Sequence, residues 1–182
     1  MMEYNCIIGI DPGANGGIAV NADGYYTTAK MPKPLSRLGE FLQHYRENYN
    51  PVVFIEKLAI RNDDLYGGKV FRIKSMIANY ESLKAIIAIC NVDYCEVHPL
   101  TWQARLGLRI KGEEKPKRKA RYKEAAQVLF PSLNVTMANC DALHIMRLGM
   151  ELTKSKTWKD VKWLNEHMVI NKPNADIYNN IY

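Results

Sequence analysis

The sequence predicts an α/β fold built on a mixed five-stranded sheet, with three antiparallel strands followed by parallel ones and with helices flanking the sheet. Two strand-like runs at 17–21 and 25–31 are separated by Ala-Asp-Gly, and Asp-Gly in that position is a strong hairpin signal. A helical pattern over 35–49 is followed by PVVFIE at 51–56, which is apolar until its last residue, as central parallel strands usually are. These observations predict a meander that continues into a parallel strand.

The other elements follow from apolar periodicity and from residues that end helices and strands. The run YNCIIGI at 4–10 is short and rich in isoleucine, which predicts a buried first strand. Apolar residues repeat at three- and four-residue steps over 72–90, so we expect a long helix whose buried face includes Met76 and Ile77. The remaining prediction is a strand at 92–97, a short helix at 100–106, a loop at 107–118, a helix at 119–130 and a last helix at 139–153.

The length and the net charge of the chain limit the classes of protein to which it can belong. The chain of 182 residues fits one main domain, which we place at 1–155, followed by a C-terminal tail at 156–182. In the tail, KTWKDVKWLNEHM, which contains Trp158 and Trp163, is compatible with a short amphipathic helix. The chain has 25 Lys and Arg residues against 19 Asp and Glu residues, and the net charge of +6 favours a polyanionic partner such as nucleic acid.

The cellular compartment is predicted from cysteine usage and from the first residues. The four cysteines have no paired spacing and no CxxC motif, so reduced thiols without a metal are the simplest interpretation. The start MMEYNCIIGID lacks the basic and apolar regions of a signal peptide. No apolar run approaches the roughly 18 residues that a membrane span needs. We therefore expect a soluble cytoplasmic protein with no membrane partner.

Three carboxylates stand at positions that a fold of this kind brings together. In IGIDPGANGGIAV at 8–20, the first strand ends on Asp11 and enters a glycine-rich turn, while Glu56 ends the fourth strand. If these strands lie side by side, their carboxyl ends present both acids at one edge of the sheet. Asp141, in the first turn of the last helix, can be added from above, and His144 shares its helical face.

Two chemistries fit this opening motif, namely a metal held by the carboxylate and a phosphate cradled by the glycines. Carboxylate oxygens are the ligands that Mg²⁺ prefers, and two such ions about 3.5–4 Å apart promote phosphodiester hydrolysis. Simpler interpretations stay open for each residue alone. Glu56 can be a surface residue at a strand end, Asp141 can favour the helix N-terminus, and His144 can be a half-buried helix residue.

A basic run occupies residues 115–123, KPKRKARYK, which has six basic residues in nine and no acid. Such a run is often a solvated face. Placed between the sheet edge and the last helix, it is instead a candidate phosphate clamp, with contacts that ignore sequence and weaken with salt. The candidate DNA-binding residues here are Lys115, Lys117, Arg118, Lys119, Arg121 and Lys123.

Four motifs in the same order resemble the RuvC-type Holliday junction resolvases, most of all the compact branch carried by phages and prophages. They are IGIDPG at 8–13, FIEK at 54–57, the passage from WQARLGL to AAQVLFP at 102–131, and CDALHI at 140–145. The resemblance implies an RNase H-like fold and a homodimeric two-metal endonuclease of DNA recombination and repair. It also implies paired nicks in a four-way DNA junction, and a bacterial or phage-infected host cytoplasm.

Carried over residue by residue, the family's acidic cluster matches Asp11, Glu56 and Asp141, which would bind two Mg²⁺ ions, or Mn²⁺ in their place. Lys119 lies where the family has a lysine near its active site, so the resemblance implies that Lys119, and then Lys123, steadies the scissile phosphate.

The chain departs from the family at one position of this cluster. Family members often carry another acid one turn before the DAL aspartate, where this chain has Met137 and Ala138. His144, one turn later, is our candidate for its replacement, either as a metal ligand or as the base for the attacking water.

The loop after Glu56 corresponds to the region that reaches the junction centre in the family. Phe71 is the candidate aromatic, since stacking on an unpaired base is worth roughly 1–3 kcal/mol; alternatively it begins the core face of the next helix. That helix can pack wholly inside its own domain; in resolvases its counterpart helps to form the dimer, as a symmetric junction requires. The DNA-binding candidates of this segment are Arg61, Lys69, Phe71 and Arg72.

Three other functions compete with the resolvase hypothesis. An actin-like ATPase or sugar kinase would use IGIDPGANGG for phosphate, but that fold needs two lobes and a second glycine-rich motif, which this short chain lacks. Another RNase H-like nuclease, acting on RNA–DNA hybrids or flaps, would differ only in substrate. A non-catalytic junction-binding protein is suggested by the missing acid near Ala138 and would bind without cutting.

Overall fold

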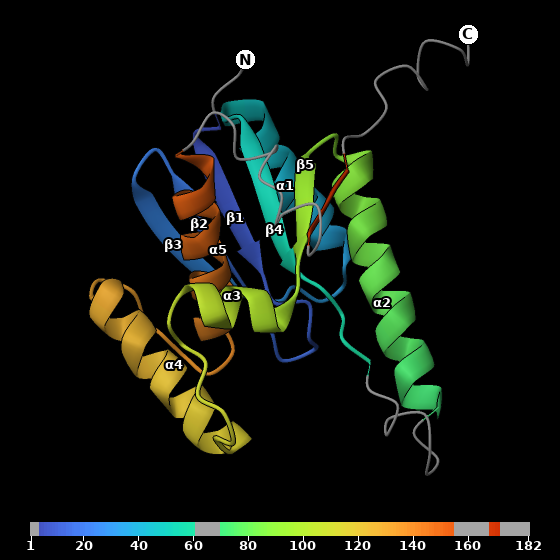
Figure 1. Cartoon of the computed structure of the whole chain (residues 1–182). Helices are drawn as coiled ribbons and strands as arrows, with labels where there is room; N and C mark the ends of the chain where they lie inside the picture. Colours follow the sequence, from blue (N-terminus) through green and yellow to red (C-terminus); the bar gives the residue numbers. More distant parts are fainter. Residues whose placement is uncertain (1–3, 61–69, 155–167, 172–182) are drawn as a thin grey trace, which may run out of the picture.

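The structure is a computed structural model that describes residues 4–60, 70–154 and 168–171 (Figure 1). Its described strands are β1 (Cys6–Ile10), β2 (Gly17–Ala22), β3 (Tyr25–Lys30), β4 (Pro51–Glu56), β5 (Asp93–Val97) and β6 (Met168–Asn171). The described helices are α1 (Ser36–Asn48), α2 (Val70–Ile89), α3 (Pro99–Arg105), α4 (Lys115–Leu129) and α5 (Cys140–Thr153).

The sheet runs in the order β3-β2-β1-β4-β5-β6. The first three strands pair antiparallel, whereas β1, β4 and β5 pair in parallel, so the predicted mixed arrangement is confirmed for five strands. The sixth strand, β6, pairs antiparallel with β5 and lies in the segment predicted as a tail. Its sequence, MVIN, is too short for a periodic signal and becomes a strand only through this pairing. Most of the helix predicted around Trp158 and Trp163 lies outside the described residues.

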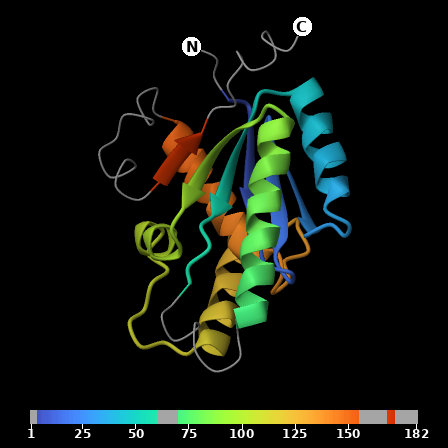
Figure 2. The same ribbon diagram turned by 90° about the vertical axis from the view of Figure 1, so that its right-hand side faces the viewer.

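Successive side chains of β1 point to opposite faces of the sheet and pack into two separate cores. Ile7 belongs to the core beneath α3, α4 and α5, whereas Ile8 and Ile10 belong to the core beneath α1 and α2. Figure 2 shows this layering, with α5 on one side of the sheet and α1 on the other. The central strands are therefore covered on both faces, which explains why their sequences are apolar throughout.

Helix α5 packs directly on β1 because Gly9 has no side chain. A Cβ atom on Gly9 would lie 2.3 Å from the carbonyl oxygen of Ala142 and 2.4 Å from the backbone nitrogen of Met146. Any other residue there would push α5 away from the sheet. This contact sets the first turn of α5, with Asp141, over the carboxyl end of β1.

The basic run is helical from its beginning, so the prediction of a loop extending to residue 118 was wrong. Helix α4 begins at Lys115, and Pro116 stands within its first turn. Proline suits this position because its fixed φ angle matches the helix and its missing N–H has no partner to lose there. The basic side chains of residues 115–123 therefore project from a helix and not from a loop.

Helix α2 buries less of its apolar pattern than predicted. Met76 and Ile77 are 37% and 39% exposed, although the periodicity places them on the buried face. The first half of α2 extends past the end of the sheet, so the described part of the chain leaves Met76 and Ile77 partly uncovered (Figure 1). The residues of α2 that are buried are Ile73, Tyr80, Leu83 and Ile87. Among the described helices, none is long and apolar enough to cross a membrane.

Candidate active site

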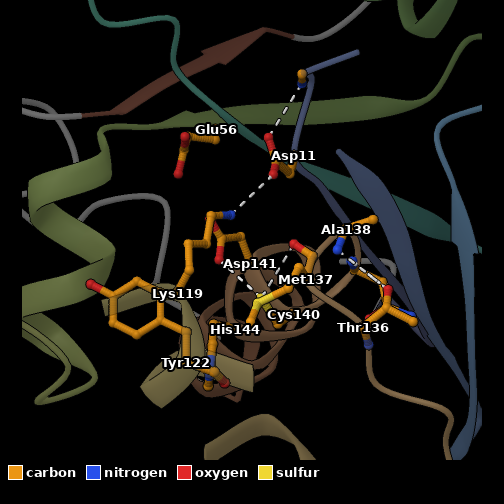
Figure 3. Close-up of polar contacts among 12 residues, drawn as sticks. Asp11, Glu56, Lys119, Tyr122, Thr136, Met137, Ala138, Cys140, Asp141 and His144 are labelled. Atoms are coloured by element: carbon orange, nitrogen blue, oxygen red, sulfur yellow. Dashed lines mark hydrogen bonds and ion pairs between the residues drawn. The ribbon is translucent and has the colours of Figure 1, made fainter. Parts of the chain in front are cut away.

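The three predicted carboxylates converge at one edge of the sheet (Figure 3). Ile10 of β1 is the partner of Ile55 in the parallel β1–β4 pair, so Asp11, just after β1, and Glu56, the last residue of β4, lie side by side. Asp141 approaches from the first turn of α5. The juxtaposition predicted from strand order is therefore present, with each acid contributed by a different element.

The turn after Asp11 is held by backbone hydrogen bonds and requires glycine at one point. The N–H of Asp11 donates to the carbonyl of Gly17 at 3.0 Å, and that of Gly16 donates to Gly13 at 2.7 Å. A Cβ on Gly16 would lie 2.1 Å from the carbonyl oxygen of Asp11, which excludes a side chain there. The N–H of Gly13 donates to Oδ1 of Asp11 at 3.2 Å, so the turn also orients the carboxylate.

Lys119 inserts its ammonium group between two of the acids. Its Nζ forms an ion pair and hydrogen bond with Oδ2 of Asp141 and lies 3.9 Å from Oδ2 of Asp11. Burial alone would lower the pKa of Lys119, but the charges of Asp141 and Asp11 outweigh it and raise that pKa. The lysine therefore stays charged and acts as an internal counterion of the cluster.

One ammonium does not balance three carboxylates, and the pKa values of Glu56 and Asp11 reflect this. Burial, followed by repulsion from Asp11, raises the pKa of Glu56 to about 8. Burial and the charge of Asp141 also raise the pKa of Asp11, against the opposing effect of Lys119. A site that holds acids at such raised pKa values favours an additional cation.

The donor set fits a hard divalent ion, although the side chains are not arranged around one. Carboxylate oxygens are the ligands of Mg²⁺ and Mn²⁺. In the described part of the chain, however, no group of three His, Cys, Asp or Glu side chains is placed to hold a metal. The Lys119 ammonium lies between Asp11 and Asp141 instead, so binding an ion there requires its displacement.

Trp102 is a site residue that the sequence analysis did not assign. It lies on α3, is fully buried, and its Nε1–H donates to Oε2 of Glu56 at 2.7 Å. A signal for it existed, since a buried indole N–H needs an acceptor and α3 directly follows the strand next to β4. The short helix therefore orients Glu56 from the side.

His144 lies beneath the carboxylates, in an aromatic cluster, and is fully buried (Figure 3). Its ring stacks on Trp102 at a centroid distance of 6.1 Å and meets Tyr122 edge-on at 5.8 Å. Its Nε2 lies 2.9 Å from the carbonyl oxygen of Tyr122, which only accepts, so Nε2 carries the proton. This geometry gives His144 a packing role between α4 and α5.

The tautomer of His144 limits what it can ligate. Burial lowers its pKa, which keeps the ring neutral near pH 7. Nδ1 has no hydrogen-bond partner among the residues that the structure describes, and it is the ring nitrogen that retains a lone pair. The assignment of His144 as ligand or base stays a prediction, now restricted to Nδ1.

The position of the missing acid contains no alternative ligand. Met137 is 50% exposed and Ala138 is half-buried in the loop before α5. The hydroxyl of Thr136 accepts from the N–H groups of Ala138 and Asn139 at 3.3 and 3.4 Å, which fixes this loop. The cluster consequently has three acids.

The basic residues of α4 divide into three groups. Lys115 and Lys119 lie on the side of the carboxylates, since Lys115 as well as Lys119 lowers the pKa of Asp11. Arg121 is engaged within the chain, where it donates to both carboxylate oxygens of Glu113 at 2.9 and 2.6 Å and to the carbonyl of Leu108 at 2.7 Å. Its assignment to DNA therefore competes with a structural role. Lys117, Arg118 and Lys123 form no ion pair within the described residues.

The first turn of α2 presents an aromatic side chain to solvent. Phe71 is 83% exposed, so the alternative in which it begins the core face of the helix was wrong. Arg72 is exposed beside it, whereas Arg61 and Lys69 lie outside the described residues. Figures 1 and 2 show that the first turns of α2 and α4 lie at the same end of the molecule, which is the end where β1 and β4 finish.

The strand order and the two helical layers define a mixed α/β fold, in which three antiparallel strands are followed by parallel ones. No model of a known protein family matches the chain, and no curated protein sequence matches it. Among solved structures, the chain is similar to Thermus thermophilus RuvC in complex with a Holliday junction substrate, with a TM-score of 0.48 and 13% identity over 81% of this chain and 96% of that one. It is similar to a second Thermus thermophilus RuvC structure with a TM-score of 0.48 and 14% identity over 80% and 96% of the two chains.

Proposed function

We propose that the protein is a metal-dependent, structure-specific endodeoxyribonuclease that resolves four-way and other branched DNA junctions. The observation that carries this proposal is the convergence of Asp11, Glu56 and Asp141, with Lys119 between them, at the carboxyl edge of the sheet. Buried acids that face one another are costly unless they serve a cation. The motifs that resemble the RuvC-type resolvases support the choice of reaction.

The acids would hold Mg²⁺ or Mn²⁺, and His144 is a further candidate through Nδ1. Bound there, a pair of such ions activates water and stabilises the leaving oxygen of a phosphodiester. The chain's own residues prepare the site. Trp102 orients Glu56 through its hydrogen bond, and the Gly13 N–H orients Asp11.

Lys119 has two roles in this proposal. Without metal, its ammonium neutralises part of the acidic cluster. Once the acids serve a metal, the same ammonium is available to the scissile phosphate, at the place where the strand enters the site. Hydrolysis then leaves a 5′-phosphate and a 3′-hydroxyl, as in related nucleases.

The DNA would lie across the end of the molecule where α2 and α4 begin. Lys115, Lys117, Arg118 and Lys123 supply charge along α4 without an ion pair in the described chain. Phe71, exposed on the first turn of α2, would stack on a base at the junction centre. Arg72 lies beside it.

A homodimer would supply the second active site that a symmetric junction requires. The first half of α2 exposes apolar side chains that the described part of the chain leaves uncovered, namely Val70, Phe71, Met76 and Ile77. We assign part of the dimer interface to this half of α2. The protein would act in the cytoplasm of a bacterium or of a phage-infected host.

A second candidate, a junction-binding protein without cleavage, is favoured by one observation. Met137 and Ala138 leave the cluster with three acids, and no group of three potential ligands in the described residues is already arranged around an ion. In that case the fold and the basic helix would serve binding alone.

The deciding experiment is cleavage of a labelled four-way junction in Mg²⁺ and in Mn²⁺, beside a plain duplex, a flap and an RNA–DNA hybrid. Asp11→Asn is the inactive variant, and Glu124→Gln, which removes one exposed charge from α4, is the matched control. Paired nicks in the junction that Asp11→Asn abolishes would support the proposal. Tight binding without cutting would favour the second candidate, and preferential cutting of the hybrid or flap would favour another RNase H-like nuclease.

A further inference from the structure

A cavity of about 420 Å³ lies beside the turn that follows Asp11. Its walls come from three segments, which are the turn itself, the end of β3 with the residues just beyond it, and the loop before α5. The lining residues that matter here are Ala14, Asn15, Gly16, Lys30, Lys33 and Ala138. We call this cavity the lysine pocket.

The lysine pocket has the chemistry of an anion site. Lys30 and Lys33 are exposed, and neither forms an ion pair within the described residues. No Asp or Glu lines the pocket. The backbone N–H groups of Ala14 and Asn15 donate to no group in the part of the chain that the structure describes. Successive N–H groups in a turn commonly bind anions.

The pocket is tied to the acidic cluster by the backbone. The N–H of Met31 donates to the carbonyl of Gly16 at 3.1 Å, which holds the lysine segment against the turn that carries Asp11. In Figure 3, Ala138 lies on the side of Asp11 away from Glu56. The carboxylates and the pocket are therefore neighbours that share one turn.

Ala138, which lines the lysine pocket, carries no charge that would repel an anion. An acid there would put a negative charge into the wall of the lysine pocket, facing the same space as Lys30 and Lys33. Alanine leaves the wall neutral. A neutral residue at position 138 is therefore compatible with an anion in the lysine pocket.

We propose that the lysine pocket binds a backbone phosphate of the DNA, distinct from the phosphate that is cut and close to it along the strand. This inference rests on the proposed function and extends it, because the contact would fix how far the strand reaches past the acidic cluster. The same glycine-rich turn would then orient a carboxylate on one side and receive a phosphate on the other.

The test measures binding of a four-way junction by Lys30→Gln and Lys33→Gln, in an Asp11→Asn background and over a range of salt concentrations. Each substitution is expected to lower the slope of log affinity against log salt by about 1, because each removes one phosphate contact. Lys154→Gln, at the far end of α5 from Asp141, is the control and should leave the slope unchanged.

A second pair of variants tests the neutral wall. Ala138→Asp should weaken junction binding several-fold without metal, whereas Ala138→Asn, of nearly equal size, should not. If the lysine variants keep the parent's salt slope, or if Ala138→Asp binds as well as Ala138→Asn, the pocket proposal is overturned.

Calorimetric Mn²⁺ binding, in the background with Asp11 intact, checks that the two lysines act on DNA alone. Lys30→Gln and Lys33→Gln are expected to keep the parent's Mn²⁺ affinity. A loss of Mn²⁺ affinity in either variant would overturn the assignment of the pocket to a separate phosphate. Failure of the pocket and failure of the proposed function are distinguishable. If the parent protein cuts the junction in pairs but the lysine variants keep its salt slope, only the pocket proposal is overturned. If the parent protein neither binds nor cuts the junction, the pocket proposal and the proposed function are both overturned.

Discussion

Trp102 donates its indole N–H to Oε2 of Glu56 at 2.7 Å, and its ring stacks on His144 behind that contact. The hydrogen bond joins α3 to the end of β4 and opposes the rise in the pKa of Glu56. A carboxylate at the edge of the sheet is therefore held by an aromatic residue 46 positions further along the chain.

Replacing Trp102 with Phe should disturb Glu56 more than it disturbs the fold. The variant loses the N–H, so the pKa of Glu56 should rise above about 8, which carboxyl NMR titration of the metal-free protein measures. Loss of a residue that orients a metal ligand typically costs 10- to 100-fold in affinity or activity, and we expect about that loss in Mn²⁺-dependent cleavage. Tyr122→Phe, in the same aromatic cluster, is the control. Equal effects of the two substitutions would contradict a specific role for Trp102.

Stability of the metal-free protein should fall as the pH rises from about 5 to 9. The pKa of Glu56 is 4.5 in the unfolded chain and about 8 in the folded one, so folding retains a proton that the unfolded chain releases in this window. This contribution is complete below pH 4.5 and is lost as the pH passes 8, at about 1.4 kcal/mol per pKa unit and at most about 5 kcal/mol in total. Thermal unfolding in chelator measures it. Glu56→Gln should flatten the curve, and a variant that retains the full slope would assign the effect to other groups.

Lys119→Gln should move metal affinity and activity in opposite directions. The ammonium lies between Asp11 and Asp141, where an ion would have to displace it, so its removal should tighten Mn²⁺ binding measured by calorimetry. Cleavage should fall, because the phosphate loses its cationic partner. Lys123→Gln, one turn along α4 and without an ion pair to these acids, should leave Mn²⁺ affinity unchanged. Weaker Mn²⁺ binding by Lys119→Gln would show that the lysine supports the metal site.

Gly9→Ala should destabilise the protein by about 1–3 kcal/mol, the usual range for overpacking, because its Cβ would overlap the backbone of α5 at Ala142 and Met146. Chemical denaturation measures the change. Gly39→Ala is the matched control, since a Cβ there would lie 3.7 Å from Cγ2 of Ile86, an ordinary contact. Within α1 that change should be neutral or stabilising by up to about 1 kcal/mol. Similar losses at both glycines would contradict the direct packing of α5 on β1.

Ile77→Glu should give a monomer, because it places a charge on the apolar half of α2 to which we assign the dimer interface. Sedimentation measures the association state, and a junction with both strands labelled measures whether nicks remain paired. Ser82→Glu, exposed on the same helix beyond that half, is the control. A parent protein that sediments as a monomer, or an Ile77→Glu dimer, would contradict this interface.

Strand order and the meeting of the acids were predictable because both follow from local signals. The Asp-Gly hairpin and the apolar run at 51–56 determine which strands neighbour β1, and parallel pairing then brings Asp11 beside Glu56. To predict which acids meet, only the carboxyl ends of β1 and β4 had to be identified. Each end is marked by the first acid after an apolar run.

The contacts around the acids could not be predicted in the same way, because they join segments far apart in the chain. Nothing in the local sequence pairs Arg121 with Glu113 rather than with DNA, or directs the indole of Trp102 to Glu56. The start of α4 at Lys115 was missed, although Pro116 stands in its first turn, where proline is favoured. Exposure of Met76 depends on where the sheet ends, which periodicity does not record.

The contact at Gly9 bears on how this protein can change over evolutionary time. Elsewhere in the two cores, a larger or smaller side chain can alter the spacing between layers, and its neighbours can adjust. At Gly9 the strand contributes no side chain, so the backbone of β1 meets the backbone of α5 at Ala142 and Met146. The separation of Asp11 and Asp141 is thereby set at this point by a backbone contact and not by the size of core side chains.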